Sequence, residues 1–144
     1  MKEIMVTDVV TIDAAATLLD AARRMRDDNV GMLPVLEDGR LRGIVTDRDL
    51  VVRAVAEGVE PGAVPVREFL TERVIAASPN WTTDRALQTM AAAKLGRLPV
   101  VDDRARVVGI VTLSSLVLRG RDREEALEAA KEVSRRSARR ASAA

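Results

Sequence analysis

The sequence of 144 residues contains no cysteine, no histidine and no tyrosine, and it has one tryptophan and one phenylalanine. Without cysteine there is no disulfide or thiolate chemistry, which favours a reducing compartment. Without histidine the commonest general base and metal ligand is missing. These absences argue against hydrolases and metalloenzymes. We therefore expect a protein that is not an enzyme and that has no metal site and no required cofactor.

Long hydrophobic runs are also missing. No apolar stretch approaches the roughly 20 residues that a membrane span needs, and Glu3 lies where a signal peptide would be basic and then apolar. We therefore expect a cytoplasmic protein with no membrane partner. The net charge of +1 gives no general attraction to nucleic acid. The basic cluster at 135–140 has no base-stacking aromatic beside it, so we interpret it as solvated.

The strongest feature that is present is an internal repeat. The run Gly31–Val35 (GMLPV) recurs as Gly96–Val100 (GRLPV), and Gly43–Thr46 (GIVT) recurs as Gly109–Thr112. The offset is 65 residues for the first pair and 66 for the second, so the turn between them has gained one residue. Two copies of this size indicate two similar supersecondary units, each too small to bury its apolar face alone.

Both copies predict the same order of elements, which is strand, helix, strand, strand, helix. A threonine precedes each long helix as a cap, and apolar residues follow at spacings of three and four. In the first copy we expect strands at 9–12, 32–36 and 41–45, with helices at 17–28 and from 46 to about 56. In the second copy we expect strands at 74–77, 97–101 and 107–111, with helices at 82–93 and 114–118.

The segment between the copies has the composition of a linker, because 57–65 carries two glycines and two prolines. We predict a first repeat at 1–57, a linker at 58–66 and a second repeat at 67–120. The remaining residues, 121–144, are rich in alanine, arginine and glutamate and have little to bury. We expect them to form an exposed tail.

This repeated pattern resembles the tandem cystathionine β-synthase (CBS) domain pair over about residues 1–120. The resemblance rests on Leu-Pro-Val in the second strand and Gly-Ile-Val-Thr at the end of the third strand, both present in both copies. Thr46–Asp49 (TDRD) further resembles small stand-alone bacterial CBS-pair proteins. The family implies an α/β fold in which two pseudo-twofold-related β-α-β-β-α repeats pack through their sheets, the Bateman module. It also implies adenine-nucleotide binding in clefts between the repeats, and frequent homodimers.

Thr46 and Asp49 are three residues apart where a strand ends and a helix begins. This is the spacing of a capping box, which by itself explains both residues. A carboxylate at a helix start also accepts hydrogen bonds from a ribose diol, and the family uses this aspartate for ribose. Capping and binding are compatible roles.

In the family, a nucleotide takes its ribose contact from one repeat and its adenine and phosphate contacts from the other. For this chain the resemblance implies a good cleft formed by Ile44, Thr46, Asp49, Leu70, Ile75, Gly96 and Arg97. Arg97 replaces the Met32 of the first copy, and a guanidinium there would pair with phosphate. The alternative is a surface arginine at a strand end. Ile75 and Leu70 would form an apolar wall for the purine, or would serve as core residues.

The mirror cleft is degraded in sequence. Its residues are Met5, Val10, Gly31, Met32, Thr112 and Ser115. Ser115 lies where the ribose carboxylate is expected, and no arginine accompanies it. We therefore predict one good site and one degraded site in each chain.

Two other features could suggest a binding site, but we interpret both as structural. Asp47 and Asp49 point to different sides of a helix, so we do not expect them to hold a metal ion. Trp81, in the loop before a helix, is expected to pack under the sheet or at a dimer seam rather than against a ligand.

The resemblance implies a regulatory module that senses AMP, ADP, ATP or another adenosyl ligand. The module would signal to a separate regulated protein through rotation of one repeat, or of one chain of a homodimer, against the other. The alternative function is a ligand-free scaffold or dimerisation protein with vestigial clefts. An enzyme is the third alternative, and the acids form no convincing pair with a nucleophile.

Overall fold

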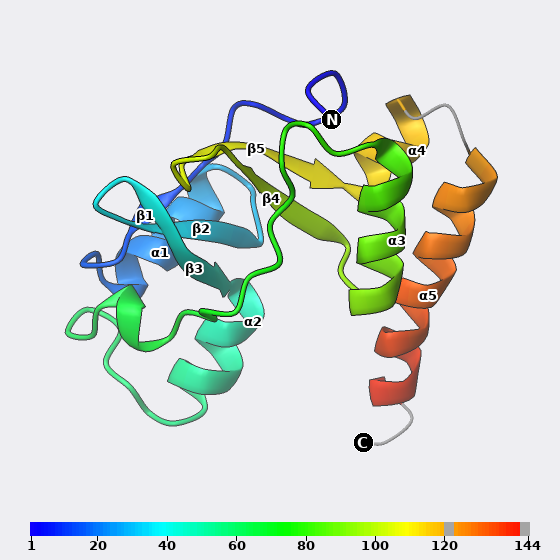
Figure 1. Ribbon diagram of the computed structural model, residues 1–144. Helices are drawn as coiled ribbons and strands as arrows, with labels where there is room; N and C mark the ends of the chain where they lie inside the picture. Colours follow the sequence, from blue (N-terminus) through cyan, green and yellow to red (C-terminus); the bar gives the residue numbers. More distant parts are fainter. Residues whose placement is uncertain (120–122, 142–144) are drawn as a thin grey trace. The chain divides into compact units, whose positions relative to one another are not determined.

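The structure is a computed structural model that describes residues 1–119 and 123–141 (Figure 1). Its contacts divide the chain into two compact units. The first-repeat unit comprises Val10–Val74 and Asp103–Val107, and the second-repeat unit comprises Met1–Val9, Ile75–Asp102 and Val108–Ala144. Each unit therefore contains segments from both halves of the chain, which a simple cut at the linker does not anticipate.

The first-repeat unit contains a three-stranded sheet in the order β1-β2-β3. Its strands are β1 (Ile12–Asp13), β2 (Met32–Glu37) and β3 (Arg40–Thr46). β1 is parallel to β2, and β2 is antiparallel to β3 across a two-residue turn at Asp38 and Gly39. Both turn residues have positive φ, 51° and 73°, as a hairpin turn of this length requires. The register places Met32 opposite Thr46, so β2 begins where β3 ends.

Helix α1 (Leu18–Asp27) forms as predicted because its start is capped and its inner face is apolar. Thr17 Oγ1 accepts the Asp20 amide at 3.1 Å, and Asp20 Oδ2 accepts the Thr17 amide at 3.0 Å. Leu18, Ala21 and Met25 are buried at helical spacing in the core of this unit. The predicted cap is confirmed. The sequence pattern also places Ala22 in the buried stripe, and there it is wrong, because Ala22 is exposed.

The helix after β3 changes its hydrogen-bond register within a few residues. It begins as α2 (Asp47–Asp49) and continues as η1 (Leu50–Val55), a π-helix. The Ala56 amide accordingly donates to the Val51 carbonyl, five residues back, at 3.0 Å. Leu50 and Ala54 face the core, whereas Val51, Val52 and Val55 are exposed.

The second-repeat unit repeats this plan with a two-stranded sheet. Its elements are α3 (Thr83–Ala93), β4 (Arg97–Val101), β5 (Val107–Thr112) and α4 (Leu113–Arg119). The strand predicted at 74–77 reduces to a single parallel bridge between Ala77 and Val100, the repeat equivalent of Ile12 beside Val35. Thr82 caps α3 as predicted, accepting the Arg85 amide at 3.2 Å.

The C-terminal segment is helical, and most of the side chains that the structure describes in it are exposed, such as Leu127 at 55%. Residues Arg123–Ala141 form the helix α5, which packs against α3 and α4 (Figure 1). Ala129 is 3% exposed and belongs to the core of the second-repeat unit. A small residue suffices here because it lets two helix backbones approach closely, so burial does not need a large apolar side chain. The arginines at 136, 139 and 140 have no described side chains.

The first segment of each repeat pairs with the sheet of the other repeat. Val6 forms an antiparallel bridge with Ile110 of β5, and Thr71 forms one with Ile44 of β3. The short 3-10 helix η2 (Val66–Glu68) leads into Thr71. The two bridges are equivalent in the repeat, because 71 and 6 differ by 65 and 110 and 44 differ by 66. This exchange explains why Met1–Val9 belongs to the second-repeat unit. Asp103–Val107 belongs to the first-repeat unit for another reason, since the Leu41 amide donates to the Ala105 carbonyl at 2.8 Å.

Candidate functional site

The predicted capping box at the end of β3 is present. The Thr46 amide and hydroxyl both donate to Asp49 Oδ2, at 2.9 and 2.8 Å, and the Asp49 amide donates to Thr46 Oγ1 at 3.2 Å. The helix start thereby fixes the orientation of the carboxylate. Because the cap uses Oδ2, the other oxygen, Oδ1, remains available on a side chain that is 20% exposed.

A neighbour of Asp49 that the sequence prediction did not assign to the site is Arg53. Its Nη1 lies 3.8 Å from Asp49 Oδ1 and donates a hydrogen bond of 2.8 Å to the Phe69 carbonyl. The guanidinium also lies 5.7 Å from the centre of the Phe69 ring. The spacing of four residues from Asp49 was the available sequence signal. Arg53 therefore links the carboxylate to the segment that precedes Thr71.

Leu70 and Ile44 lie in the same unit as Asp49, where that segment crosses β3. The amides and carbonyls of Ile44 and Thr71 pair at 3.1 and 2.8 Å. A Cβ on Gly43 would lie 2.5 Å from Leu70 Cδ1 and 2.7 Å from the Thr71 carbonyl oxygen, so only glycine permits this approach. Leu70 is 8% exposed and belongs to the core of this unit.

The other three residues predicted for the good cleft lie in the second-repeat unit. Ile75 has an exposed fraction of 42%. The Gly96 carbonyl accepts the Leu113 amide at 3.0 Å, and a Cβ on Gly96 would lie 3.9 Å from Val133 of α5. Arg97 is exposed at the start of β4 and has no ion-pair partner among the described residues. The structure thus groups Ile44, Thr46, Asp49 and Leu70 in one unit and Ile75, Gly96 and Arg97 in the other.

The equivalent box in the second-repeat unit contains serine. The Thr112 amide donates to Ser115 Oγ at 3.0 Å, and the Ser115 amide donates to Thr112 Oγ1 at 3.0 Å. Ser115 Oγ also donates to the Thr112 carbonyl at 2.9 Å, and the residue is 8% exposed. The single hydrogen of the hydroxyl is therefore used inside the cap. This box preserves the helix start but offers no free carboxylate oxygen.

The remaining residues predicted for the degraded cleft are also divided between the units. Met5 packs on Gly109, where a Cβ would lie 2.6 Å from its sulfur. The Gly31 carbonyl accepts the Asp47 amide at 3.1 Å, and Met32 is buried at the start of β2. Val10 packs against the core of the first-repeat unit. This set contains no charged side chain that could meet a phosphate.

Two classes of site have no support among the described residues. No three or more aspartate or glutamate side chains gather where they could hold a metal ion in the part of the chain that the structure describes. Within the same residues, no helix combines the length and the apolar character that a bilayer crossing requires.

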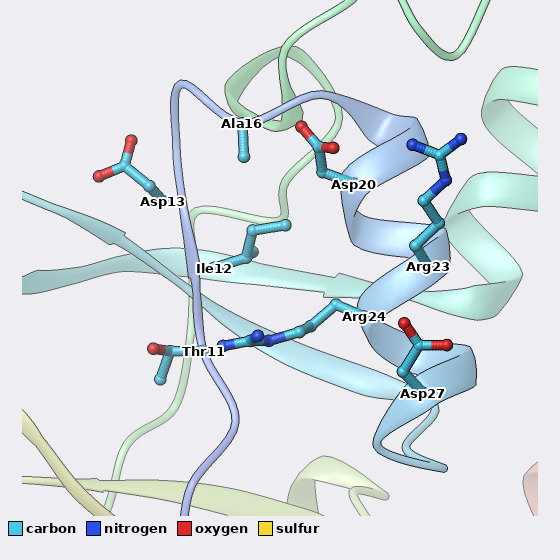
Figure 2. Close-up of a pocket in the computed structure, with 8 residues that line it drawn as sticks. All are labelled: Thr11, Ile12, Asp13, Ala16, Asp20, Arg23, Arg24 and Asp27. Carbon is cyan, nitrogen blue, oxygen red and sulfur yellow. The ribbon is translucent and has the colours of Figure 1, made fainter.

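A pocket of about 400 Å³ lies elsewhere in the first-repeat unit, between β1 and α1 (Figure 2). Ile12 and Ala16 contribute apolar surface to it, and charged side chains of α1 surround them. None of the predicted site residues lines this pocket.

Comparisons with known sequences and with solved structures indicate the same protein family. The family model described as the CBS domain matches residues 1–55 and again 66–121. The CBS domain-containing protein YhcV of Bacillus subtilis is 38% identical over 126 residues, which cover 88% of this chain and 89% of YhcV.

Two solved structures show the same fold. Hypoxic Response Protein I, solved with two coordinated zinc ions, aligns with a TM-score of 0.74 and 31% identity, covering 81% of this chain and 95% of that one. Its namesake in the curated sequences comes from Mycobacterium tuberculosis. The CBS domain pair of protein MJ0100, in complex with 5′-methylthioadenosine and S-adenosyl-L-methionine, aligns with a TM-score of 0.71 and 29% identity, covering 82% and 96%. With both repeats matched by the family model, this chain belongs to the CBS domain family and has the α/β fold of a CBS pair.

Proposed function

We propose that this chain is a non-catalytic regulatory module that binds an adenosyl ligand through Asp49 and Arg97. The proposal rests on the two carboxylate oxygens of Asp49, which have different contacts. Oδ2 caps the helix, and Oδ1 lies 3.8 Å from Arg53 Nη1. Oδ1 is outside the cap and makes only a long ion pair with Arg53, and a carboxylate oxygen held in one orientation is a good acceptor for a ribose hydroxyl. The complex of the MJ0100 pair with two adenosyl compounds supports this class of ligand.

Arg97 supplies the contact that distinguishes a nucleotide from a nucleoside. Its guanidinium is exposed and has no ion-pair partner among the described residues, so pairing with a phosphate breaks no existing bond. The equivalent Met32 is 6% exposed and uncharged. One good site per chain, with AMP, ADP or ATP as its ligand, is the outcome that these differences favour.

The test compares two ligands that differ in the phosphate. Thermal shift and calorimetry with AMP and with 5′-methylthioadenosine should both show binding to the wild type, because ligand binding stabilises the folded state by mass action. Asp49→Asn, which keeps a capping oxygen but removes the charge, should weaken both ligands at least tenfold. Arg97→Ala should weaken AMP alone.

The controls come from within the repeat. Ser115→Ala alters the equivalent of Asp49, and Arg40→Ala removes an arginine that also begins a strand, β3. Neither control should change binding by more than a factor of two. Absence of heat with AMP, ATP and S-adenosylmethionine would favour the ligand-free scaffold instead. Two equal sites per chain would contradict the asymmetry, and nucleotide turnover lost in Asp49→Ala would point to an enzyme.

As part of the same proposal, the chain forms a homodimer through the exposed side of η1. Val51, Val52 and Val55 are 59%, 47% and 63% exposed. Arg48 precedes this apolar surface and Glu57 follows it, and within the described residues neither side chain has an ion-pair partner. If a second copy packed antiparallel, each Arg48 would lie beside the Glu57 end of the other copy's helix, so the surface is complementary to itself.

Charge exchange tests this dimer. Arg48→Glu alone and Glu57→Arg alone should each weaken the homodimer at least tenfold in sedimentation equilibrium. An equimolar mixture of the two variants should recover a heterodimer, because both contacts then become attractive. If each variant dimerises like the wild type, or if the mixture stays monomeric, the proposed surface is wrong.

A further inference from the structure

The pocket between β1 and α1 has an apolar floor and a charged rim. Ile12, which is 9% exposed, and the partly buried Ala16 supply the floor and belong to or pack against the core. Figure 2 shows Asp20 and Arg23 above, Asp27 below, and Arg24 extended from α1 toward Thr11. β1 is an edge strand, so nothing in the sheet covers this side of it.

The second repeat has a large side chain at the equivalent position. The two repeats are in the same backbone register here, since Thr17 and Thr82 both cap a helix. In the same register, the Val66 amide donates to the Ala16 carbonyl at 2.8 Å, and the Met1 α-ammonium donates to the Trp81 carbonyl at 3.2 Å. Position 16 therefore corresponds to position 81. The first repeat has a methyl group where the second has an indole.

In the second-repeat unit that indole fills its place and is covered by a cation. Trp81 packs against the core of the unit, and the Arg85 guanidinium lies 4.3 Å from the centre of its ring. Arg85 corresponds to Asp20 and the small Ala77 corresponds to Ile12. The second repeat thus combines a small residue with an indole, whereas the first combines Ile12 with Ala16, and both of these line the pocket.

We propose that this pocket is a second binding site, separate from Asp49 and Arg97, that takes a flat aromatic amine. The aromatic ring would lie on Ile12 and Ala16 in the place that the Trp81 indole has in the other repeat. A volume of about 400 Å³ is within the range of small-ligand pockets and accommodates a bicyclic ring.

The rim selects the charge of the ligand. Three carboxylates and two guanidiniums line the pocket, so the acids are in excess. Asp13 and Asp20 each use one oxygen for a backbone amide, of Ala15 and Thr17 respectively, and keep the other oxygen free among the described residues. Where Arg85 stacks in the second repeat, the first repeat has the acid Asp20. An amine is therefore preferred over a carboxylate on the same ring.

The experiment uses tryptamine and indole-3-acetate, which share the indole and differ in charge, with ¹⁵N-labelled full-length protein and NMR titration. Tryptamine should shift the backbone amides of Ile12, Ala16 and Asp20, and indole-3-acetate should bind at least fivefold more weakly. An N-acetylated tryptophan amide, added in a parallel titration, separates recognition of a free amine from recognition of a tryptophan side chain.

Two filling variants and one matched control complete the test. Ala16→Trp rebuilds the side chain of the second repeat, and Ala16→Leu is a smaller filler in case the indole disturbs the fold. Either should abolish the tryptamine shifts, whereas Ala15→Trp, one residue away on an exposed side chain that does not line the pocket, should retain them. Shifts that persist in both filled variants, that arise only outside the pocket, or that are equal for the two charges would overturn the proposal.

Discussion

The two repeats share a backbone and differ in the chemistry that they present. Thr46 and Thr112 cap equivalent helices with nearly the same hydrogen bonds. The partner of Thr46 is Asp49, a carboxylate with one oxygen outside the cap, and the partner of Thr112 is Ser115, whose one hydroxyl hydrogen is used within the cap. The comparison shows that one capping geometry can be kept for stability in both repeats while the residue at its third position decides whether a ligand contact remains.

The largest difference should come from the glycines under the exchanged segments. At Gly43 a Cβ would lie 2.7 Å from a backbone oxygen of Thr71, which cannot move without breaking the bridge to Ile44. At Gly109 its nearest neighbour is the flexible Met5 side chain, and the backbone oxygen of Val6 lies at 3.1 Å. Overpacking should lower the free energy of unfolding by about 3 kcal/mol in Gly43→Ala and about 1 kcal/mol in Gly109→Ala. Urea denaturation followed by circular dichroism measures both, and equal losses would contradict the asymmetry.

Removing the indole should make the second repeat resemble the first. Trp81→Ala loses the packing of a partly buried ring and its contact with Arg85. We expect a loss of about 2 kcal/mol, below the range for fully buried aromatics because the ring is partly exposed. Arg85→Ala, which removes only the cation over the ring, should cost less than 1 kcal/mol by the usual size of such contacts. The same circular-dichroism melts report both variants.

The two caps should differ in their tolerance of a lost hydroxyl. Thr46→Ala removes a partner of the half-buried Asp49, and the cost should be about 1 kcal/mol, as for other helix caps. Thr112→Ala leaves the amide of the buried Ser115 without its acceptor, so the cost should rise to about 2 kcal/mol. A Thr→Ser change at either position keeps the oxygen and serves as the control. If Thr46→Ala costs more than Thr112→Ala, the proposed difference between the two caps is wrong, and Asp49 depends on the Thr46 hydroxyl more than the geometry indicates.

The smallest effect concerns acid. Hydrogen bonds from Thr17 lower the pKa of Asp20 below its ordinary value of 3.8, whereas the equivalent residue of α3 is Arg85. A lowered pKa in the folded state gives stability that is present above pH 3.8 and is lost as the pH falls through the folded-state pKa. The difference between wild type and Asp20→Asn should therefore shrink as denaturation is repeated from pH 5 toward pH 3. A difference that does not change with pH would exclude the charge as its cause.

Local sequence signals predicted the helix starts and the capping chemistry of the site. Thr17, Thr46 and Thr82 each cap a helix as expected, because a cap depends on residues within three positions of one another. The Leu-Pro-Val strands also lie where the pattern places them, with Leu33 and Leu98 fully buried.

Features that depend on distant contacts were not predictable in the same way. The π-helical hydrogen bonds of η1, which span five residues rather than four, were not predicted, because the pattern of side chains does not distinguish the two. The link from Arg53 to Phe69 requires the segment before Thr71 to cross β3, which no local pattern records. The packing of α5 against α3 and α4 was not predicted either, although Ala129 and Val133 are four apart and share a face.

The exchange of first segments has a consequence for the origin and the dissection of this protein. In a protein made of a single repeat, the first segment, equivalent to Val6 or Thr71, would pair with the sheet of a second copy, and the second copy's first segment would pair with the sheet of the first. That is the arrangement of a domain-swapped pair of identical chains, which gene duplication and fusion would convert into one polypeptide. An expression fragment cut within the linker should consequently lack a segment that its sheet pairs with. A circular permutant opened between residues 9 and 10 would keep both of the pairing segments in the chain.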